Sequence, residues 1–246
     1  MRHRFFVGNK TIIGGEIRLT GENAAHASVL RLTTGEEIVI CNGDATDYHC
    51  VVINCSKTEV IAKILHSKPN SAEPSIAVTL YQAIPKTGKM EEIVERCTQI
   101  GVSGIVPVIT SRCVAKASDR DTKKVGRWQK IAQSAASQSQ RGRIPQIRDV
   151  MMFESALQEA KTCDTVFVCY EDERQISLKE FLQNLKRSLS SIALFIGPEG
   201  GFSDAEVSKF KENSIATVSL GPRILRTELA GVVASANILY ELGERI

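Results

Sequence analysis

The sequence predicts an α/β protein in two parts, a small β-rich unit over residues 1–70 and a larger domain over residues 75–246. Short Val- and Ile-rich runs separated by turn residues fill the first part, which is typical of a small barrel. Residues 68–75 have the composition of a linker. After the linker, apolar strands alternate with helical patterns, as in domains built around a mainly parallel sheet.

Within the first part, residues 22–32 have the composition of a helix. Three strands follow, over residues 37–41, 48–54 and 59–65. Asn42-Gly43 separates the first two strands and is a strong hairpin signal, because both central residues of a type I′ turn need positive φ.

In the second part, residues 76–84 are almost wholly apolar, as in a strand that is covered on both faces. Apolar residues then recur at helical spacing from Met90 to Ile100, and the pattern stops at Gly101. The remaining predicted strands are 105–109, 165–169, 192–196 and 217–220, and the remaining predicted helices are 125–139, 178–189, one after Ser203 and one from Thr227 to about Leu242.

The composition excludes several classes of protein. Of the 246 residues, 43% are hydrophobic and 24% charged, as in an ordinary folded chain. No apolar run reaches the ~20 residues of a membrane-spanning helix, and the N-terminus lacks the apolar stretch of a secretory signal. The seven cysteines include no Cys-x-x-Cys pair. We therefore expect reduced cysteines, no metal site, no membrane partner and a cytoplasmic location.

Basic residues gather in the middle of the chain. Residues 86–148 contain 13 Lys and Arg against 5 Asp and Glu, whereas residues 1–85 contain 8 of each. Cations that neutralise phosphates release counterions, so this excess favours a nucleic-acid partner, although a solvated helix face is the alternative. Residues 138–148 carry three Arg, no acidic residue and several side-chain amides, which favours nucleic acid.

Two predicted strand ends carry glycine loops, at the place where α/β sheets bind ligands. The first loop is Gly-Pro-Glu-Gly-Gly at 197–201, and Ser203 and Glu206 then have capping-box spacing for a helix. Three glycines let a backbone approach a ligand closely, whereas a plain turn needs one. The second loop runs over 220–230, with Thr227 as the expected helix N-cap. Neither loop matches a P-loop or a dinucleotide fingerprint.

The motifs GPEGGFS at 197–203 and LGPRILRTELA at 220–230 closely resemble those of the RsmE family, RNA methyltransferases of the SPOUT class. Leu229 departs from that pattern, because the family usually has Thr at this place. Weaker matches follow in the right order over nearly the whole chain, and they include RFFV at 4–7, HASVLR at 26–31, KME at 89–91, Arg112 and Arg127-Trp128.

The resemblance implies a SPOUT α/β domain with a deep trefoil knot, and a PUA-like N-terminal barrel that helps to bind RNA. It implies a homodimer that uses S-adenosylmethionine (SAM) to methylate N3 of a uridine in 16S rRNA, either free or in the assembled small ribosomal subunit. The residues that it places at the SAM site are Ile196, Gly197, Pro198, Glu199, Gly200, Gly201, Leu220, Ile224, Leu225, Arg226, Thr227 and Leu229.

This chemistry assigns roles to a few side chains. SAM supplies an electrophilic methyl group, so the reaction needs neither a metal nor a covalent nucleophile. N3 of uridine must lose a proton, which calls for a base or a cation beside the uracil oxygen. We expect Arg226 to stabilise that oxygen and Glu199 to accept the proton; a structural ion pair and a helix cap are their alternative roles. The expected contacts to the rRNA backbone are Arg2, Arg4, Arg31, Lys86, Lys89, Arg112, Arg141 and Arg143.

Two other functions remain compatible with the sequence. A SPOUT methyltransferase could act on tRNA or on a ribose 2′-OH, which nucleoside analysis of the product would reveal. A non-catalytic RNA-binding module for ribosome assembly would bind RNA but not SAM, and Leu229 is the feature that hints at it.

Overall fold

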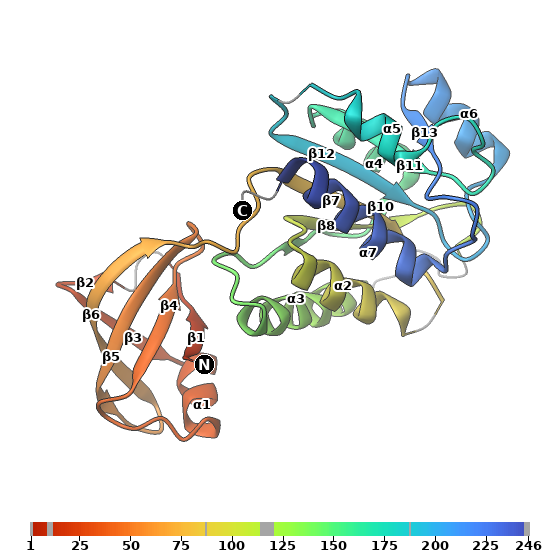
Figure 1. Cartoon of the computed structure of the whole chain (residues 1–246). Coiled ribbons are helices and arrows are strands. Elements are labelled where there is room, and N and C mark those ends of the chain that lie inside the picture. Colours follow the sequence, from red (N-terminus) through yellow and green to blue (C-terminus); the bar gives the residue numbers. More distant parts are fainter. Residues whose placement is uncertain (1, 9–11, 87, 114–120, 187, 244–246) are drawn as a thin grey trace. The chain divides into compact units, whose positions relative to one another are not determined.

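A computed structural model of the chain describes residues 2–8, 12–86, 88–113, 121–186 and 188–243. The chain forms two compact units (Figure 1). The first comprises Met1–Glu73 and Ala136–Ile144, and the second comprises Pro74–Ala135 and Pro145–Ile246. The main division lies inside the predicted linker. Residues 136–144, however, belong to the first unit. The first unit is therefore discontinuous in sequence, and a single domain boundary does not describe it.

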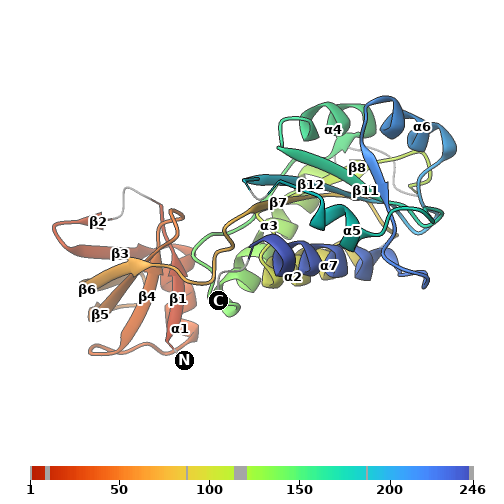
Figure 2. The ribbon, with the colours of Figure 1, turned by 45° about the horizontal axis from the view of Figure 1, so that its top comes forward.

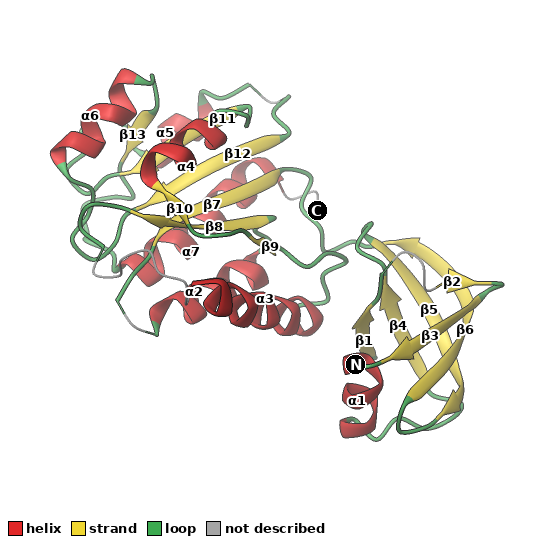
Figure 3. Ribbon diagram, turned by 180° about the vertical axis from the view of Figure 1, so that it is seen from behind, coloured by secondary structure: helices red, strands yellow, loops and turns green. Residues whose placement is uncertain are grey.

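The first unit is a curled sheet of six strands in the order β1-β4-β5-β6-β3-β2 (Figures 1 and 3). Its neighbouring strands are antiparallel, except that β1 and β4 are parallel. The elements are β1 (His3–Phe6), β2 (Ile12–Ile13), β3 (Glu16–Thr20), α1 (Glu22–Val29), β4 (Glu37–Cys41), β5 (Thr46–Cys55) and β6 (Glu59–Pro69).

One face of this sheet carries the core of the unit. Ile38 of β4 pairs with Cys50 of β5, and both side chains are fully buried. Each fully buried aliphatic side chain of this kind contributes about 1.5–3 kcal/mol to stability. The other core side chains on this face come from every longer strand and from α1, and they include Phe5, Ile17, Leu19, Ala27, Ile40, Val52, Val60 and Ala62.

The predicted hairpin between β4 and β5 is present, but its turn differs from the expected one. Four residues connect the strands, and positive φ occurs at Gly43 and Ala45 rather than at Asn42 and Gly43. Side chains close the loop, because Asn42 Oδ1 accepts a hydrogen bond from the Asp44 N–H and Asp44 Oδ1 accepts one from the Thr46 N–H. Short polar side chains of this type replace the backbone bond of a tight turn.

The second unit is built on a parallel sheet in the order β10-β8-β7-β12-β11-β13, with β9 also paired to β8. All of its strand pairs are parallel, as predicted. The strands are β7 (Ala77–Ala83), β8 (Gly104–Ile109), β9 (Gln146–Ile147), β10 (Met151–Met152), β11 (Thr165–Cys169), β12 (Ser191–Ile196) and β13 (Ala216–Val218). The central strands β7 and β12 are covered on both faces, which explains their nearly unbroken apolar sequences.

Helices cover this sheet on both faces (Figure 2). Helices α2 (Lys89–Ile100) and α7 (Thr227–Ile238) pack side by side on one face, and α4 (Phe153–Ala160) and α6 (Asp204–Glu212) lie on the other. Helix α4 was not predicted, although its buried residues 153, 156, 157 and 160 have helical spacing. The remaining elements are α3 (Asp121–Gln138), α5 (Leu178–Gln183), which is shorter than predicted, and the π-helical turn η2 (Leu239–Gly243).

None of the helices in the described part of the chain is both long and apolar enough to span a membrane. The seven cysteines are all free thiols in the structure.

A buried ionic network fastens residues 136–144 to the first unit. Arg4 Nη1 and Nη2 donate to the two carboxylate oxygens of Asp47 at 2.7 and 2.9 Å, and Nη1 also donates to the carbonyl of Arg141 at 3.1 Å. Arg141 in turn pairs with Glu73, with Nη2 2.9 Å from Oε2. Only 4% of the Arg4 side chain and 2% of the Arg141 side chain are exposed. The expectation that these two arginines contact RNA therefore needs correction, because each guanidinium is enclosed with a carboxylate.

We predict that Arg4→Met lowers the free energy of unfolding by about 3–5 kcal/mol, because it leaves the Asp47 carboxylate buried without its cation. Burial alone would raise the pKa of Asp47, but hydrogen bonds from Arg4, Asn70 and Cys41 outweigh it and lower the pKa. The stability that this carboxylate gives is present above its unfolded pKa and is lost as the pH falls through its lower folded pKa. The difference between variant and wild type should therefore shrink in acid.

Denaturant unfolding at several pH values measures both effects. Arg18→Met is the matched control, because Arg18 pairs with Glu59 on the same sheet with 59% of its side chain exposed. Exposed pairs of this kind contribute at most about 1 kcal/mol. Equal losses of unfolding free energy in the two variants would show that the buried pair of Arg4 contributes no more to stability than the exposed pair of Arg18.

Candidate active site

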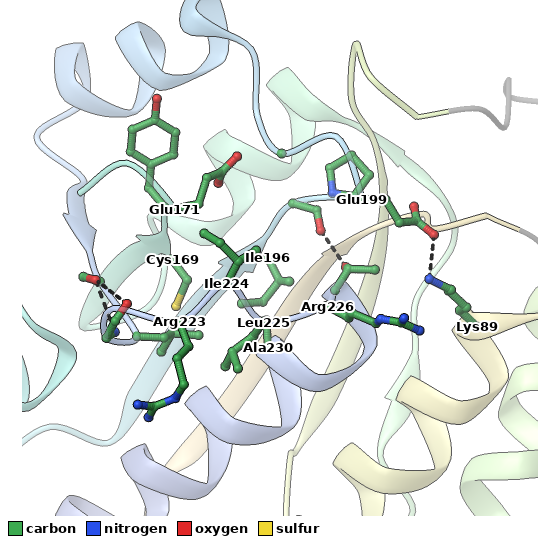
Figure 4. Close-up of a pocket in the computed structure, with 18 residues that line it drawn as sticks. Lys89, Cys169, Glu171, Ile196, Glu199, Arg223, Ile224, Leu225, Arg226 and Ala230 are labelled. Atoms are coloured by element: carbon green, nitrogen blue, oxygen red, sulfur yellow. Dashed lines mark hydrogen bonds and ion pairs between the residues drawn. The ribbon is translucent and has the colours of Figure 1, made fainter. Parts of the chain in front are cut away.

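A cavity of about 340 Å³ lies at the carboxyl ends of β11, β12 and β13 (Figure 4). This is the edge where α/β sheets bind ligands, and the volume lies within the range of small-molecule sites. The lining residues follow these three strands or begin α2 and α7. They are Lys89, Cys169, Tyr170, Glu171, Ile196, Gly197, Pro198, Glu199, Gly201, Ser219, Leu220, Gly221, Arg223, Ile224, Leu225, Arg226, Thr227 and Ala230.

The glycines after β12 let the chain fold tightly against its own neighbours. Gly201 has a φ of 67°, and a Cβ added there would lie 1.9 Å from Oε1 of Glu171. A Cβ added at Gly197 would lie 3.2 Å from the Cα of Gly201. Part of the predicted close approach is therefore internal, because the loop packs on itself and against the carboxylate that follows β11.

A chain of two hydrogen bonds joins strand β7, helix α7 and the loop after β12 beside the site. Thr227 Oγ1 donates to the carbonyl of Gly197 at 2.6 Å, and Gln82 Nε2 donates to Thr227 Oγ1 at 3.0 Å. The prediction that Thr227 caps helix α7 is wrong, because Arg226 is the N-cap residue and it makes no side-chain capping bond. Gln82 was missed, although a fully buried amide in an otherwise apolar strand is a signal of such a role.

The predicted capping box of α6 is confirmed, and it extends further than expected. Ser203 Oγ accepts from the Glu206 N–H, and Glu206 Oε2 accepts from the Ser203 N–H at 2.8 Å. Glu206 also accepts hydrogen bonds from the N–H and hydroxyl of Ser111, in the loop after β8. In the same loop, Arg112 Nη1 donates to the carbonyl of Gly200 at 2.8 Å. The loop after β8 therefore holds both the glycine loop and the first turn of α6 in place.

At the mouth of the cavity, one ammonium lies between two carboxylates. Lys89 Nζ is 3.2 Å from Glu199 Oε1 and 3.1 Å from Glu228 Oε2. Burial alone would raise the pKa of Glu199, but backbone N–H groups, among them that of Lys86, and the Lys89 ammonium hold it below its ordinary value. Glu199 is therefore a carboxylate at neutral pH. It does not cap α6, where Ser203 and Glu206 make the capping bonds.

Arg226 lines the same cavity and is exposed. Its guanidinium makes no hydrogen bond or ion pair within the part of the chain that the structure describes, so the structural ion pair considered for it is not observed there. A guanidinium whose donors make no such bonds can interact with a bound anion or with a developing negative charge.

Ten of the twelve residues expected at the cofactor site line the cavity, whereas Gly200 and Leu229 do not. The segment Cys169-Tyr170-Glu171 also lines the cavity and was not predicted, although it lies at the end of the neighbouring strand β11, where strand-end reasoning places ligand contacts. Burial raises the pKa of the Cys169 thiol, so this cysteine is not a ready nucleophile.

The residues expected to contact RNA fall into three groups. Arg4 and Arg141 are buried. Arg2 pairs with Glu37, Lys89 pairs with carboxylates, and Arg112 bonds to a carbonyl. Arg31, Lys86 and Arg143 are exposed. Among the described residues, no group of three or more His, Cys, Asp and Glu side chains comes together as a candidate metal site.

Comparison with protein families matches both units. Residues 72–239 match the family described as RNA methyltransferase domain, and residues 19–65 match the RNA methyltransferase PUA domain. The protein named ribosomal RNA small subunit methyltransferase E from Bacillus subtilis is 34% identical over 228 residues, which cover 91% of this chain and 89% of the relative. The protein of the same name from Mycobacterium bovis is 30% identical over 94% of this chain and 88% of its own length.

Solved structures are similar over the whole chain. The ribosomal RNA small subunit methyltransferase E from Neisseria gonorrhoeae, bound to S-adenosyl methionine, has a TM-score of 0.88 at 28% identity and covers 99% of both chains. A methyltransferase from Legionella pneumophila, in complex with the cofactor SAM, has a TM-score of 0.88 at 28% identity and covers 100% of both chains. From the two family matches, the similarity to these relatives over nearly the full length and the motifs that form the cavity, the chain belongs to the RsmE family of RNA methyltransferases.

Proposed function

We propose that this protein transfers a methyl group from SAM to N3 of a uridine in the 16S rRNA of the small ribosomal subunit. The observation that carries the proposal is the cavity at the carboxyl ends of β11, β12 and β13, formed by the two motifs that resemble the RsmE family. The names of the relatives and the SAM in two similar structures support the reaction and the cofactor. A cytoplasmic location follows from the proposed substrate.

The residues of the cavity fit SAM. Ile196, Leu220 and Leu225 give apolar walls that suit a purine ring, and the glycine loops expose backbone groups without intervening side chains. Carboxylates at the cavity, Glu171 among them, can accept hydrogen bonds from hydroxyl or ammonium groups. When bound, SAM supplies a methyl group on a positively charged sulfur.

Glu199 and Arg226 complete the chemistry in this proposal. N3 of uridine gives its proton to the Glu199 carboxylate as the new N–C bond forms, and the bond from the methyl carbon to sulfur breaks with its electrons left on sulfur. Arg226 stabilises the negative charge that develops on the uracil oxygen. Glu199 then returns its proton to water. The low pKa of Glu199 supports this role only in that the group is ionised before the reaction.

A homodimer is part of the proposal. Three large apolar residues along this part of the chain are exposed: Ile224 in the loop before α7, Leu229 in α7 and Tyr240 in the turn η2 that continues the helix. Their exposed fractions are 76%, 40% and 82%. Of these side chains, Ile224 lines the cavity, and exposed large apolar side chains of this kind suit burial by a second copy of the chain. The trefoil knot stays a prediction from the family resemblance.

The experiment that tests the function is transfer of labelled methyl from SAM to small subunits from cells that lack this gene, followed by nucleoside digestion. We expect label in 3-methyluridine. Label in a 2′-O-methyl nucleoside, or in tRNA alone when both RNAs are offered, would assign another RNA target. Absence of label together with failure to bind SAM would favour the non-catalytic RNA-binding module.

We predict that Arg226→Ala abolishes methyl transfer but leaves SAM affinity within a few-fold of wild type, because the guanidinium acts on the uracil oxygen. Single-turnover rates and calorimetric titration with SAM measure the two quantities. Methyl transfer at the wild-type rate would remove Arg226 from the mechanism.

For RNA binding, we predict that Arg143→Ala weakens affinity and reduces the slope of log K against log salt by about 1, as expected for one phosphate contact. Arg141→Ala, next but one along the chain, should instead lower the thermal stability, because its guanidinium is buried with Glu73. An unchanged salt slope for Arg143→Ala would place the RNA elsewhere.

A further inference from the structure

The ammonium of Lys89 has no role in the reaction as proposed so far. Lys89 is the first residue of α2, lines the cavity and points toward Glu199 (Figure 4). It was expected to contact RNA phosphates, but its nitrogen lies 3.2 Å from Glu199 Oε1 and 3.1 Å from Glu228 Oε2. Both contacts are to carboxylates of the protein, so the ammonium stabilises the site and is not free to bind an RNA phosphate.

The Glu199 carboxylate is held from two directions. The backbone N–H of Lys86 donates to Oε1 and Oε2 at 3.1 and 3.2 Å, and the ammonium of Lys89 lies against Oε1. These contacts fix the orientation of the carboxylate before the substrate binds. The reaction then does not have to include the entropic cost of orienting it.

The second carboxylate, Glu228, depends on the same ammonium. Its side chain is 11% exposed, and its buried Oε2 atom has the Lys89 ammonium 3.1 Å away. Arg226, the N-cap residue of α7, also faces Glu228, and its charge adds to that of Lys89 in lowering the pKa of Glu228. Without Lys89, two carboxylates from different elements would face each other without the cation between them.

We propose that Lys89 is a positioning residue of the active site, whose ammonium holds the Glu199 carboxylate in its place and charge state and ties α2 and α7 to the glycine loop. The proposal rests on the proposed function only for the role of Glu199. The arrangement of the three side chains is a property of the chain by itself.

The charge state provides the sharpest test. The Lys89 ammonium helps to hold the pKa values of both Glu199 and Glu228 below their ordinary value, and the two carboxylates raise the pKa of Lys89. If the ammonium is removed, burial and mutual repulsion raise the pKa of Glu199. An opposite charge at this distance changes a carboxyl pKa by about one to three units.

The first experiment titrates the glutamate carboxyl carbons by NMR in the protein without added ligand, with Glu199→Gln to assign the resonance. We expect Lys89→Met and Lys89→Gln to move the Glu199 titration up by at least about one pH unit, and Lys89→Arg to leave it near the wild-type position. Arg96→Met is the matched control, because Arg96 is a half-exposed cation of the same helix that pairs with Glu92. An unchanged Glu199 titration in both neutral variants would overturn the proposal.

The second experiment measures single-turnover methyl transfer against pH. We expect the acid limb of the pH–rate profile of both neutral variants to move to higher pH together with the Glu199 titration, so that their loss of rate reaches about 10- to 100-fold in acid and shrinks toward neutral pH. SAM affinity should stay within a few-fold of wild type. Lys89→Arg should restore most of the rate. A pH-independent loss accompanied by weaker RNA binding and a smaller salt slope would identify Lys89 as a phosphate contact instead. If the wild-type protein transfers no methyl group, the proposed function fails, whereas the titration still decides the effect of Lys89 on Glu199.

Discussion

The hydrogen bond from the Thr227 hydroxyl to the carbonyl of Gly197 joins the first residue of α7, where the loop after β13 ends, to the loop after β12, 30 residues earlier in the sequence. Each loop leaves a different strand, and neither has a regular structure that would fix its position. Gln82 of the central strand β7 donates a hydrogen bond to the same Thr227 hydroxyl, so the contact is also anchored to the middle of the sheet. The cavity depends on this contact because its two main walls are the segments that the bond connects.

Around this contact, most charged side chains of the site are paired with neighbours inside the protein. The carboxylates of Glu199 and Glu228 share one ammonium, Glu206 is used up by the capping box and by Ser111, and Arg112 bonds to a carbonyl. Arg226 differs from these groups, because its guanidinium makes no hydrogen bond or ion pair among the described residues, although its charge acts on Glu228. Sites that act on developing charge are commonly built in this way, with most groups held by neighbours and a few left to meet the ligand.

Local patterns predicted most of the fold of the second unit. The parallel strands and the capping box at Ser203 could be identified because they depend on residues close together in the sequence. The hydroxyl of Thr227 was assigned to its own helix, whereas it serves a loop that is distant in sequence. Arg4 and Arg141 were expected on the surface for a related reason: charge counts do not show which arginine has a buried carboxylate as partner. The position of Glu171 at a strand end could be predicted, but its contact with Gly201 could not, because no local pattern relates the two residues.

The return of residues 136–144 to the first unit has a consequence for the order in which the protein assembles during synthesis. Phe6, Val39 and Cys41 pack against Ala136 and Ile144, and Arg4 bonds to the carbonyl of Arg141, 137 positions later. When the ribosome has released only the first 73 residues, the N-terminal sheet therefore still presents an apolar surface and an incomplete polar network. Contacts between such distant residues form slowly, and exposed apolar surface invites aggregation in the meantime. The nascent N-terminal unit thus has to wait for more than half of the chain before its fold can close.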